Sequence, residues 1–252
     1  MSLPVVFEDE FLLVVDKPPG LVTTPGETVK SKSLAQILQA DFGIDLERGG
    51  LVHRLDKDTS GLILVAKNAQ ILASLQNQFK SRQVKKQYLA LVHGSLNETR
   101  IVEGSIARNP GNREKFTVLA EGKEAKTEVE PLKQLTMDSE QLTEIFSDFN
   151  KIQMRKLSNL HYSKFTLTSC RPLTGRTHQI RVHLKYIGFP IVADQKYGGR
   201  KMNRLDNRWC PRMFLHAHKL EFTHPVNREW IKLETELPKD LKKVLNLLEL
   251  KA

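Results

Sequence analysis

The sequence predicts an α+β fold, and three observations support this prediction. Apolar runs of strand length occur at 11–15 and 62–66. Apolar residues spaced three and four apart, at 34–38, 72–79 and 241–248, predict amphipathic helices. Between these helices, the region 101–135 reads as a set of antiparallel strands. Strands and helices are therefore both expected, in a chain long enough to bury a sizeable core.

The composition predicts a polyanionic partner. The chain of 252 residues has the length of one large domain or two small ones, and 40% of its residues are hydrophobic. It carries 39 Lys and Arg against 29 Asp and Glu, which gives a formal net charge of +10 and a sequence pI of about 9.6. No apolar run approaches the roughly 20 residues of a membrane-spanning helix, so nucleic acid is favoured over a membrane.

The two cysteines, Cys170 and Cys210, lie far apart and form no Cys-x-x-Cys pair. This predicts a reduced, intracellular protein with neither a disulfide framework nor a zinc site. The amino terminus is acidic and lacks the charged-then-apolar pattern of a signal peptide. We therefore expect a cytoplasmic protein.

The first part of the chain predicts two strands, at 5–7 and 12–15, around an acidic turn. Ser33 then opens a short helix that ends near Gly43. Asn68 caps a second helix, which runs into a cluster of cations. The strand that follows, at 87–92, alternates with period two and presents Tyr88 on one face. The apolar stripe of the second helix consists of Leu72, Leu75 and Phe79.

The later part predicts a strand at 162–170, followed by a helix that Thr174 caps and Gly188 ends. This capping would put Arg176 in the first helical turn, beside free backbone N–H groups that suit an anion. Strands at 214–222 and 230–233 and a terminal helix after Pro238 close the chain. After the anion-binding corner at Arg176, a loop at 194–208 is the second candidate for binding RNA phosphates along a track. It is rich in cations: Lys196, Arg200, Lys201, Arg204 and Arg208.

Residues 136–160 predict a helical segment, which the family resemblance given below implies is an insertion. Apolar residues at offsets 0, 3, 4, 7 and 10, from Leu142 to Ile152, fit one amphipathic helix. The segment is longer than a usual connection and ends in a basic run. A surface helix packed on the domain is the favoured interpretation, with an RNA contact through the basic end as a further possibility.

The central motif is His53-Arg54-Leu55-Asp56-Lys57-Asp58-Thr59-Ser60-Gly61-Leu62. Asp56 stands just ahead of a turn and an apolar strand, where a rigid element would fix its carboxylate for chemistry. From the residues alone, a solvated turn capped by an aspartate is about as good an explanation. The segment resembles the catalytic motif of the RluA-type pseudouridine synthases, in which the aspartate of His-Arg-Leu-Asp is the essential residue.

Three further segments extend this resemblance over nearly the whole chain except 136–160. Lys17-Pro18-Pro19-Gly20 with Pro25 resembles the family's first motif, although a plain strand-ending loop fits equally well. Lys86-x-Tyr88 resembles a cleft motif whose tyrosine lies against the target base. The run from Leu173 to Leu184 resembles the third motif, whose arginine (here Arg176) pairs with the catalytic aspartate. The Cys-Arg-Pro sequence before it is unusual for the family.

The resemblance implies a mixed, mainly antiparallel sheet flanked by helices, with an RNA-binding cleft across its middle. It implies one catalytic domain over residues 1–252, without the separate amino-terminal RNA-binding domain of many relatives. The activity implied is isomerisation of uridine to pseudouridine in structured RNA, ribosomal RNA or transfer RNA. Neither a cofactor nor a metal is required for it, and we expect a monomer without an obligate protein partner.

The implied catalytic residues are Asp56 as the essential acid, Arg176 as its cationic partner and Tyr88 as the platform for the flipped base. Paired histidines, at 178 and 183 and at 216 and 218, could suggest metal ligands, but no convergent cysteine or carboxylate spacing supports this, and neutral hydrogen-bonded histidines are favoured. Substrate-binding candidates from the matched motifs are His53, Arg54, Thr59, Lys86 and His178.

Two other function classes remain to be weighed. A non-catalytic RNA-binding or ribosome-assembly protein of the same fold is the alternative, although binding alone does not need a carboxylate facing RNA phosphates. A glycoside or nucleoside hydrolase would need a second paired carboxylate. Asp58 is a poor candidate for that role, because it follows Asp56 by two residues in a turn.

Overall fold

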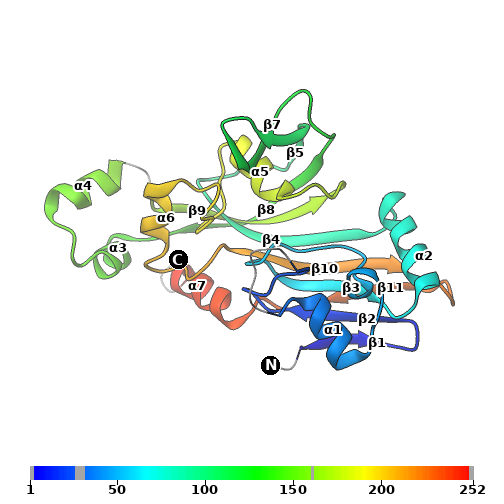
Figure 1. The fold of residues 1–252 in the computed structure, drawn as a ribbon. Coiled ribbons are helices and arrows are strands. Elements are labelled where there is room, and N and C mark those ends of the chain that lie inside the picture. Colours follow the sequence, from blue (N-terminus) through cyan, green and yellow to red (C-terminus); the bar gives the residue numbers. More distant parts are fainter. Residues whose placement is uncertain (1–2, 26–31, 160–161, 250–252) are drawn as a thin grey trace. The chain divides into compact units, whose positions relative to one another are not determined.

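The computed structural model describes residues 3–25, 32–159 and 162–249, and the chain divides into two compact units (Figure 1). The first unit contains Met1–Tyr88 and His216–Glu236, and the second contains Leu89–Leu215 and Leu237–Ala252. Neither unit is continuous in sequence. That all 252 residues form a single catalytic domain stays a prediction.

The first unit is built on a sheet in which β3 (Ser60–Ala66) is central. Antiparallel pairing joins β1 (Val5–Glu8) to β2 (Leu12–Lys17), and β2 to β3. On its other edge, β3 pairs in parallel with β10 (Leu215–Thr223), which pairs in turn with antiparallel β11 (Trp230–Glu234). One parallel pair in an otherwise antiparallel sheet agrees with the predicted mixed, mainly antiparallel fold.

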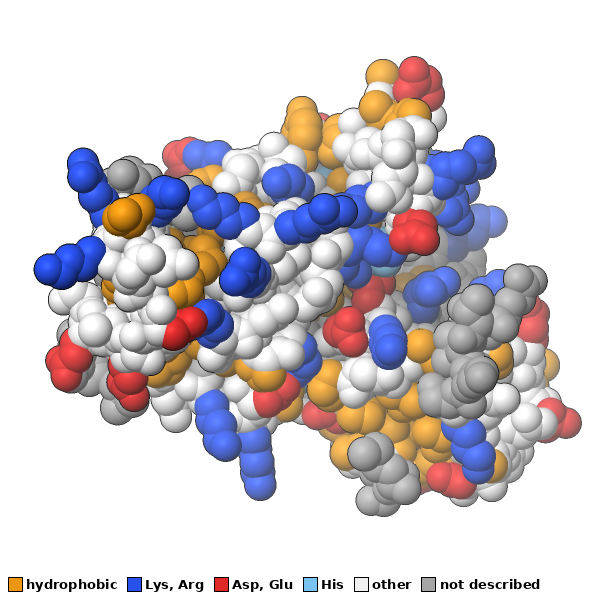
Figure 2. All heavy atoms as spheres, turned by 60° about the vertical axis from the view of Figure 1, so that its left-hand side comes forward, with side chains coloured by type: hydrophobic (Ala, Val, Ile, Leu, Met, Phe, Trp, Pro, Cys, Tyr) orange, Lys and Arg blue, Asp and Glu red, His pale blue; other side chains and the backbone are white. Residues whose placement is uncertain are grey.

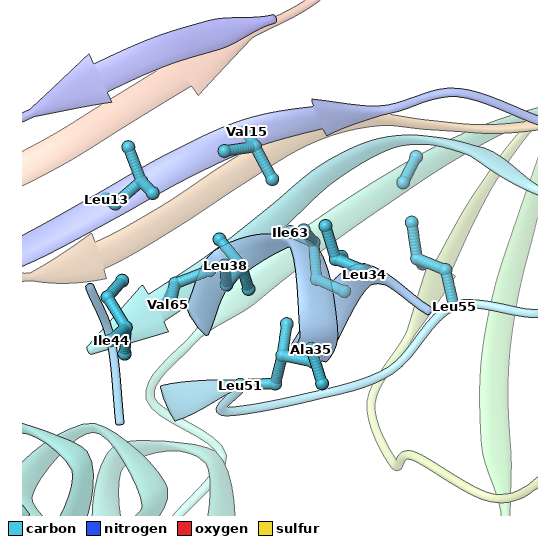
Figure 3. Close-up of a cluster of buried hydrophobic side chains, with 11 residues drawn as sticks. Leu13, Val15, Leu34, Ala35, Leu38, Ile44, Leu51, Leu55, Ile63 and Val65 are labelled. Carbon is cyan, nitrogen blue, oxygen red and sulfur yellow. The ribbon is translucent and has the colours of Figure 1, made fainter. Parts of the chain in front are cut away.

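Strands β2 and β3 are buried at nearly every position because both of their faces are covered. Figure 3 shows the side chains of one face, from Leu13 to Val65, gathered around helix α1 (Leu34–Phe42). The alternate positions, such as Leu12 and Leu64, pack into a second buried cluster with helix α2 (Ala69–Lys80). A short 3-10 segment, η1 (Glu47–Gly50), follows α1.

Both amino-terminal helices begin and end as their sequences predict. The Ser33 hydroxyl accepts from the N–H of Gln36 in a capping box, and Gly43 ends α1 in the left-handed conformation at φ 65°. Asn68 caps α2 by accepting from the N–H of Ile71. The predicted helix starts at 33 and 68 are therefore confirmed.

The second unit contains an antiparallel sheet in which β9 (Lys164–Pro172) lies between β4 (Lys85–His93) and β8 (Lys126–Thr136). The short strand β5 (Arg100–Glu103) pairs with the free side of β8, and β6 (Ile106–Asn109) forms a separate hairpin with β7 (Asn112–Val118). Helices α5 (Gln179–Tyr186) and α7 (Lys239–Glu249) pack on this unit, the latter through Leu241, Val244 and Leu248. The predicted α+β class is confirmed.

The predicted single helix in 136–160 is wrong, because the segment forms two helices. They are α3 (Ser139–Ile145) and α4 (Lys151–Asn159). Each begins at its own cap: Asp138 accepts from the N–H of Gln141, and Asn150 exchanges hydrogen bonds of 2.8 and 2.9 Å with Gln153. The second cap breaks the apolar stripe into two pieces. The last residue of the predicted insertion, 160, lies outside the described residues.

The predicted basic loop at 194–208 also contains a helix, α6 (Arg200–Asp206). Asp206 is fully buried and anchors it. Its carboxylate accepts from the Tyr162 hydroxyl at 2.6 Å and from the N–H of Ala193 at 2.8 Å, and it meets His93 Nε2 at 3.0 Å. Tertiary contacts therefore stabilise a helix that is too short and polar to form alone. None of the helices in the described ranges is long and apolar enough to span a membrane.

Candidate active site

Asp56 lies in an irregular segment directly before β3 and is half-buried. The N–H of Thr59 donates to the Asp56 carbonyl at 3.2 Å, which closes a turn, and the strand begins one residue later. Residues 54–56 are not in a strand, so strand alternation does not place Arg54 and Asp56 on a common face. Arg54 is exposed, so its guanidinium is accessible to a phosphate.

The backbone on both sides of Asp56 is fixed by two polar residues to which the sequence analysis assigned no role, Thr23 and the Lys17 of the first matched motif. On one side, the Thr23 hydroxyl donates to the Leu55 carbonyl at 2.6 Å and accepts from the Leu55 N–H at 3.3 Å. On the other side, Lys17 is fully buried and its ammonium donates to the Lys57 carbonyl at 3.0 Å. The same Lys57 carbonyl accepts from the Gly20 N–H at 2.9 Å. The first matched motif thus holds the segment that carries Asp56.

Lys17 is held by a cage of carbonyl groups. Besides the Lys57 carbonyl, its ammonium donates to the carbonyls of Pro18 at 2.8 Å and Leu21 at 2.9 Å. A buried ammonium needs such partners, because removal from water costs several kcal/mol. The motif's prolines and glycine turn the chain back on itself, and this lets the lysine reach the carbonyls that follow it.

A glycine fixes the strand that follows Asp56. Gly61 has φ of 114°, and a Cβ there would lie 2.2 Å from the carbonyl oxygen of Ala217 on β10. Only glycine allows this close parallel approach of β10 to β3. Packing against β10 therefore fixes the geometry of the motif. This strand is distant in sequence: Ser60 pairs with His216, 156 positions further along the chain.

Tyr88 lies near Asp56 in the same unit. Its ring packs against the buried cluster that contains Leu55 and Ile63. Burial raises the pKa of the Tyr88 phenol above its ordinary value, and the negative charge of Asp56 raises that pKa further. The phenol therefore stays protonated, as a neutral hydrogen-bond donor beside an acidic side chain. The structure brings these two predicted site residues together.

His53 and Lys86 share one aromatic partner, Phe79 of α2. The His53 ring stacks on Phe79 with centroids 5.0 Å apart, and the Lys86 ammonium lies 5.5 Å from the Phe79 centroid. His53 Nε2 accepts from the Leu64 N–H at 3.0 Å, so this nitrogen carries no proton. Burial, and then the charge of Lys86, lower the pKa of His53 to about 3. Burial lowers the pKa of Lys86 to about 8.

These contacts give His53 a structural role, the fixing of β3 to α2. The substrate-binding role of His53 and of Lys86 stays a prediction. Thr59, the next candidate, is 2% exposed, and its hydroxyl has no hydrogen-bond partner among the described residues. A buried hydroxyl without a protein partner is unusual in a folded protein.

Arg176 belongs to the second unit and lies in a turn, not in a helix. The predicted cap at Thr174 is wrong: α5 starts at Gln179, after His178 in the left-handed conformation at φ 55°. The side chain of Gln179 explains why residues 174–178 form a turn instead of the first turn of the helix. Its side-chain oxygen accepts from the Arg176 N–H at 2.9 Å and from the Thr174 hydroxyl at 2.7 Å, and this organises the turn.

The Gln179 amide also ties this turn to the sheet, since it donates to the Lys126 carbonyl and the Thr127 hydroxyl of β8. The exposed Arg176 side chain is directed by a 2.9 Å hydrogen bond from Nε to the Glu124 carbonyl. That Arg176 pairs with Asp56 stays a prediction. The unusual Cys-Arg-Pro sequence simply continues β9 to Pro172.

His178 is held by Tyr197. Its Nδ1 hydrogen-bonds to the Tyr197 hydroxyl at 2.8 Å, and that hydroxyl also accepts from the Phe116 N–H. Asp194, fully buried, fixes the Tyr197 loop by accepting from both Nε and Nη2 of Arg181 at 2.8 Å. The loop after α5 and the β6–β7 hairpin therefore hold the third motif from two directions.

The remaining paired histidines form hydrogen bonds, as predicted. His183 is buried between the Thr127 hydroxyl at 3.0 Å and the Gly104 carbonyl at 3.1 Å, and burial lowers its pKa. His216 meets the Ser60 hydroxyl at 3.0 Å through Nδ1. Within the described ranges, no three His, Cys, Asp or Glu side chains are grouped as a metal site would require.

Known proteins are similar to this chain in both sequence and fold. The model of the RNA pseudouridylate synthase family matches residues 11–186, which include every catalytic and substrate-binding residue predicted from the matched motifs. An uncharacterized RNA pseudouridine synthase of Bacillus subtilis is 38% identical over 97% of this chain and 72% of its own length. A ribosomal large subunit pseudouridine synthase D of Nitrosomonas europaea is 36% identical over 97% of this chain and 65% of its own length. The corresponding enzyme of Pseudomonas aeruginosa is 34% identical, with coverage of 98% and 72%.

Solved structures agree with the sequence relatives. A human RNA pseudouridylate synthase domain-containing protein superposes with a TM-score of 0.69 at 27% identity, covering 94% of this chain and 84% of its own. A second human protein of this description has a TM-score of 0.68 at 23% identity, with coverage of 98% and 93%, which supports the fold. The chain therefore belongs to the RNA pseudouridylate synthase family, and its resemblance to the RluA-type members is confirmed.

Proposed function

We propose that this protein is an RNA pseudouridine synthase that uses Asp56 as its essential catalytic residue. The observation that carries the proposal is the fixation of Asp56. Lys17 and Thr23 hold the backbone on either side of it, and Tyr88 lies within its electrostatic reach. A carboxylate that served only to cap a turn would not need two buried polar groups to hold its segment.

The reaction detaches uracil from its ribose and rejoins it through carbon. It consumes no oxidant, reductant or water, so no redox cofactor is required, and the proposal includes no metal. Asp56 serves as the nucleophile or the acid–base group. Tyr88 offers its ring as a stacking surface for the flipped base and its protonated phenol as a donor. Arg176, in the third motif, is the proposed cationic partner of Asp56, and its guanidinium can donate two charge-assisted hydrogen bonds to one carboxylate.

The proposed substrate is ribosomal RNA, because relatives that cover nearly all of this chain are named ribosomal large subunit pseudouridine synthases. Transfer RNA is the second candidate. The net charge of +10 suits either polyanion. We further propose that the chain acts in the cytoplasm as a monomer, as one catalytic domain with a central RNA-binding cleft. Arg54, exposed and next but one to Asp56, is the proposed contact to a phosphate beside the target uridine.

The competing function is RNA binding without catalysis. It explains the charge and the fold but not why two buried polar groups position Asp56. Replacement of Asp56 with asparagine keeps the shape of the side chain and removes its charge. We expect Asp56→Asn to bind unmodified large-subunit ribosomal RNA as the wild type does, and to form pseudouridine more than about 10³-fold more slowly.

Asp58→Asn is the matched control, since this neighbouring carboxylate lies in the same turn and is exposed. It should retain turnover within about threefold of the wild type. Pseudouridine is scored by chemical mapping of transcribed RNA after incubation with each protein. Product formation by Asp56→Asn near the wild-type rate would falsify the assignment. Arg176→Ala should lower turnover by about 10²-fold, with partial recovery in Arg176→Lys, because lysine restores charge without the planar fork.

A further inference from the structure

Helix α4 exposes a cationic face. Lys151, Arg155 and Lys156 are exposed, while Leu157 on the other side of the helix is buried. Spacing of four residues aligns Lys151 with Arg155 on one side of a helix. None of these three cations takes part in an ion pair within the described part of the chain. Like charges at this spacing destabilise a helix, and a bound polyanion would relieve the repulsion.

Helix α6 exposes a second cationic face. Arg200, Lys201 and Arg204 are exposed, and the opposite side of the helix is buried through Asn203, Leu205 and Asp206. The hydrogen bonds of Asp206 to Tyr162 and to the Ala193 N–H fix this helix to the unit. These three exposed cations are likewise absent from every ion pair among the described residues. The helix thus presents its charges from a rigid position.

The two helices are joined through Arg208. This guanidinium, two residues after α6, forms a two-point ion pair with Asp148, which lies before α4, with one N···O distance of 2.8 Å. It also lies 5.3 Å from the ring centroid of Phe146 and 4.7 Å from that of Phe149. The α3–α4 turn is therefore clamped to the end of α6. The hydrogen bond to Arg208 lowers the pKa of Asp148, and the charge of Arg204 contributes to the same direction.

The stretch of chain that supplies both helices contains few acidic residues. Between Phe149 and Trp209 the only acidic residues are Asp194 and Asp206, and both are fully buried. Asp148, the exposed acid that precedes α4 most closely in sequence, is already paired with Arg208. In Figure 2, Lys and Arg side chains gather along the upper part of the left-hand end, and most of the acidic side chains at that end lie below them. The exposed side chains of α4 and α6 that carry a charge are therefore all cationic.

We propose that this α4–α6 surface, defined by Lys151, Arg155, Lys156, Arg200, Lys201 and Arg204, binds the phosphate backbone of the substrate RNA at a segment additional to the target uridine. The inference rests on the proposed function, which supplies RNA as the ligand. It gives the insertion a role in binding, because the extra helix adds a rigid set of cations to the basic end of α6. Contacts of this kind give affinity and orientation without reading sequence.

Two triple variants test the proposal, Lys151→Gln/Arg155→Gln/Lys156→Gln and Arg200→Gln/Lys201→Gln/Arg204→Gln. The control is Lys232→Gln/Lys239→Gln/Lys243→Gln, which removes the same charge from exposed positions on β11 and α7. Each protein binds unmodified, transcribed large-subunit ribosomal RNA in filter assays between roughly 50 and 200 mM salt. Loss of three phosphate contacts should lower the slope of log K against log salt by about 2, and affinity at about 0.1 M salt by tenfold or more.

The control should change the slope by less than about 0.5. Circular dichroism and thermal unfolding verify that all three variants are folded. The proposal is overturned if the α4 and α6 variants lose no more affinity than the control. A lipid contact is the competing explanation, because Ile152 is exposed beside these cations. The proposal is also overturned if the α4 variant loses binding to vesicles of equal parts phosphatidylglycerol and phosphatidylcholine while its RNA affinity is unchanged.

The same incubations are scored for pseudouridine, and this separates the two proposals. Product formed by the wild type, together with equal salt slopes in all variants, refutes the surface and leaves the enzyme assignment intact. A wild type that forms no product, but whose α4 and α6 variants lose slope as expected, supports the surface and refutes the enzyme assignment.

Discussion

Replacement of the buried Lys17 with methionine should destabilise the protein and misplace Asp56. Methionine keeps the length of the apolar stem but removes an ammonium that donates to the carbonyls of Pro18, Leu21 and Lys57. Hydrogen bonds to a charged donor contribute about 1.5–3 kcal/mol each, but three bonds to one group are not additive, so we expect a loss of about 3–5 kcal/mol. Urea unfolding at pH 7 measures this loss, with an unchanged m-value if the folded state remains compact.

The activity of Lys17→Met should fall by about 10²-fold under conditions where the variant is still folded, because a displacement near 1 Å in a catalytic group has an effect of this size. Lys57→Met is the matched control. It alters an exposed side chain and leaves the carbonyl that Lys17 binds in place, so its stability should change by no more than about 0.5 kcal/mol. A stability loss below about 1 kcal/mol in Lys17→Met, with turnover equal to the control, would refute the claim that this lysine holds the Asp56 segment.

The described contacts support three further predictions. The pKa of His53 falls from 6.5 to about 3 on folding, so between these pH values the unfolded chain binds a proton that the folded chain does not. The free energy of unfolding should therefore decline as pH falls from 6.5 toward 3, by at most about 1.4 kcal/mol per pH unit. Urea titrations at several pH values should show a shallower decline in His53→Gln, and an identical decline would contradict this assignment. Gly61→Ala should lower the free energy of unfolding by about 3 kcal/mol or more, because the new Cβ clashes with β10. The control Gly188→Ala, at φ 86° with no atom within 4 Å of the new Cβ, should lower it by about 1 kcal/mol. Equal losses in the two variants would show that only the backbone angle matters. Gln179→Leu should slow pseudouridine formation and leave RNA affinity within about threefold, because it frees the Arg176 turn without removing a charge; parallel loss of affinity and rate would indicate general unfolding instead.

Local signals in the sequence predicted most elements of the first unit. Ser33, Asn68 and Gly43 each satisfy backbone groups at a helix end, and this chemistry depends only on near neighbours. The same kind of signal, Asn150, was present in the insertion, but an uninterrupted apolar stripe concealed it. Periodicity and capping compete there, and the cap determines the structure.

Distant contacts explain what could not be predicted. Helix α6 depends on Asp206 reaching Tyr162 and the Ala193 N–H, and no short window of sequence contains these partners. The turn that holds Arg176 depends on the Gln179 amide bridging to β8. In the candidate site, the sequence motif identified Asp56 and Tyr88, but the groups that position Asp56 were hidden: a lysine before two prolines looks like a solvated loop residue until its carbonyl partners are known.

The parallel pairing of β3 with β10 has a consequence for the order in which the chain acquires its structure during synthesis. Ser60 and His216 lie 156 positions apart, so the edge of β3 has no partner until most of the polypeptide has left the ribosome. Closing so long a loop is slow, because its entropy is lost before the pairing can compensate for it. A prematurely terminated product that lacks β10 would therefore contain the complete 53–62 motif and still be inactive. Its β3 would present an unpaired apolar edge that quality-control proteases and chaperones can recognise.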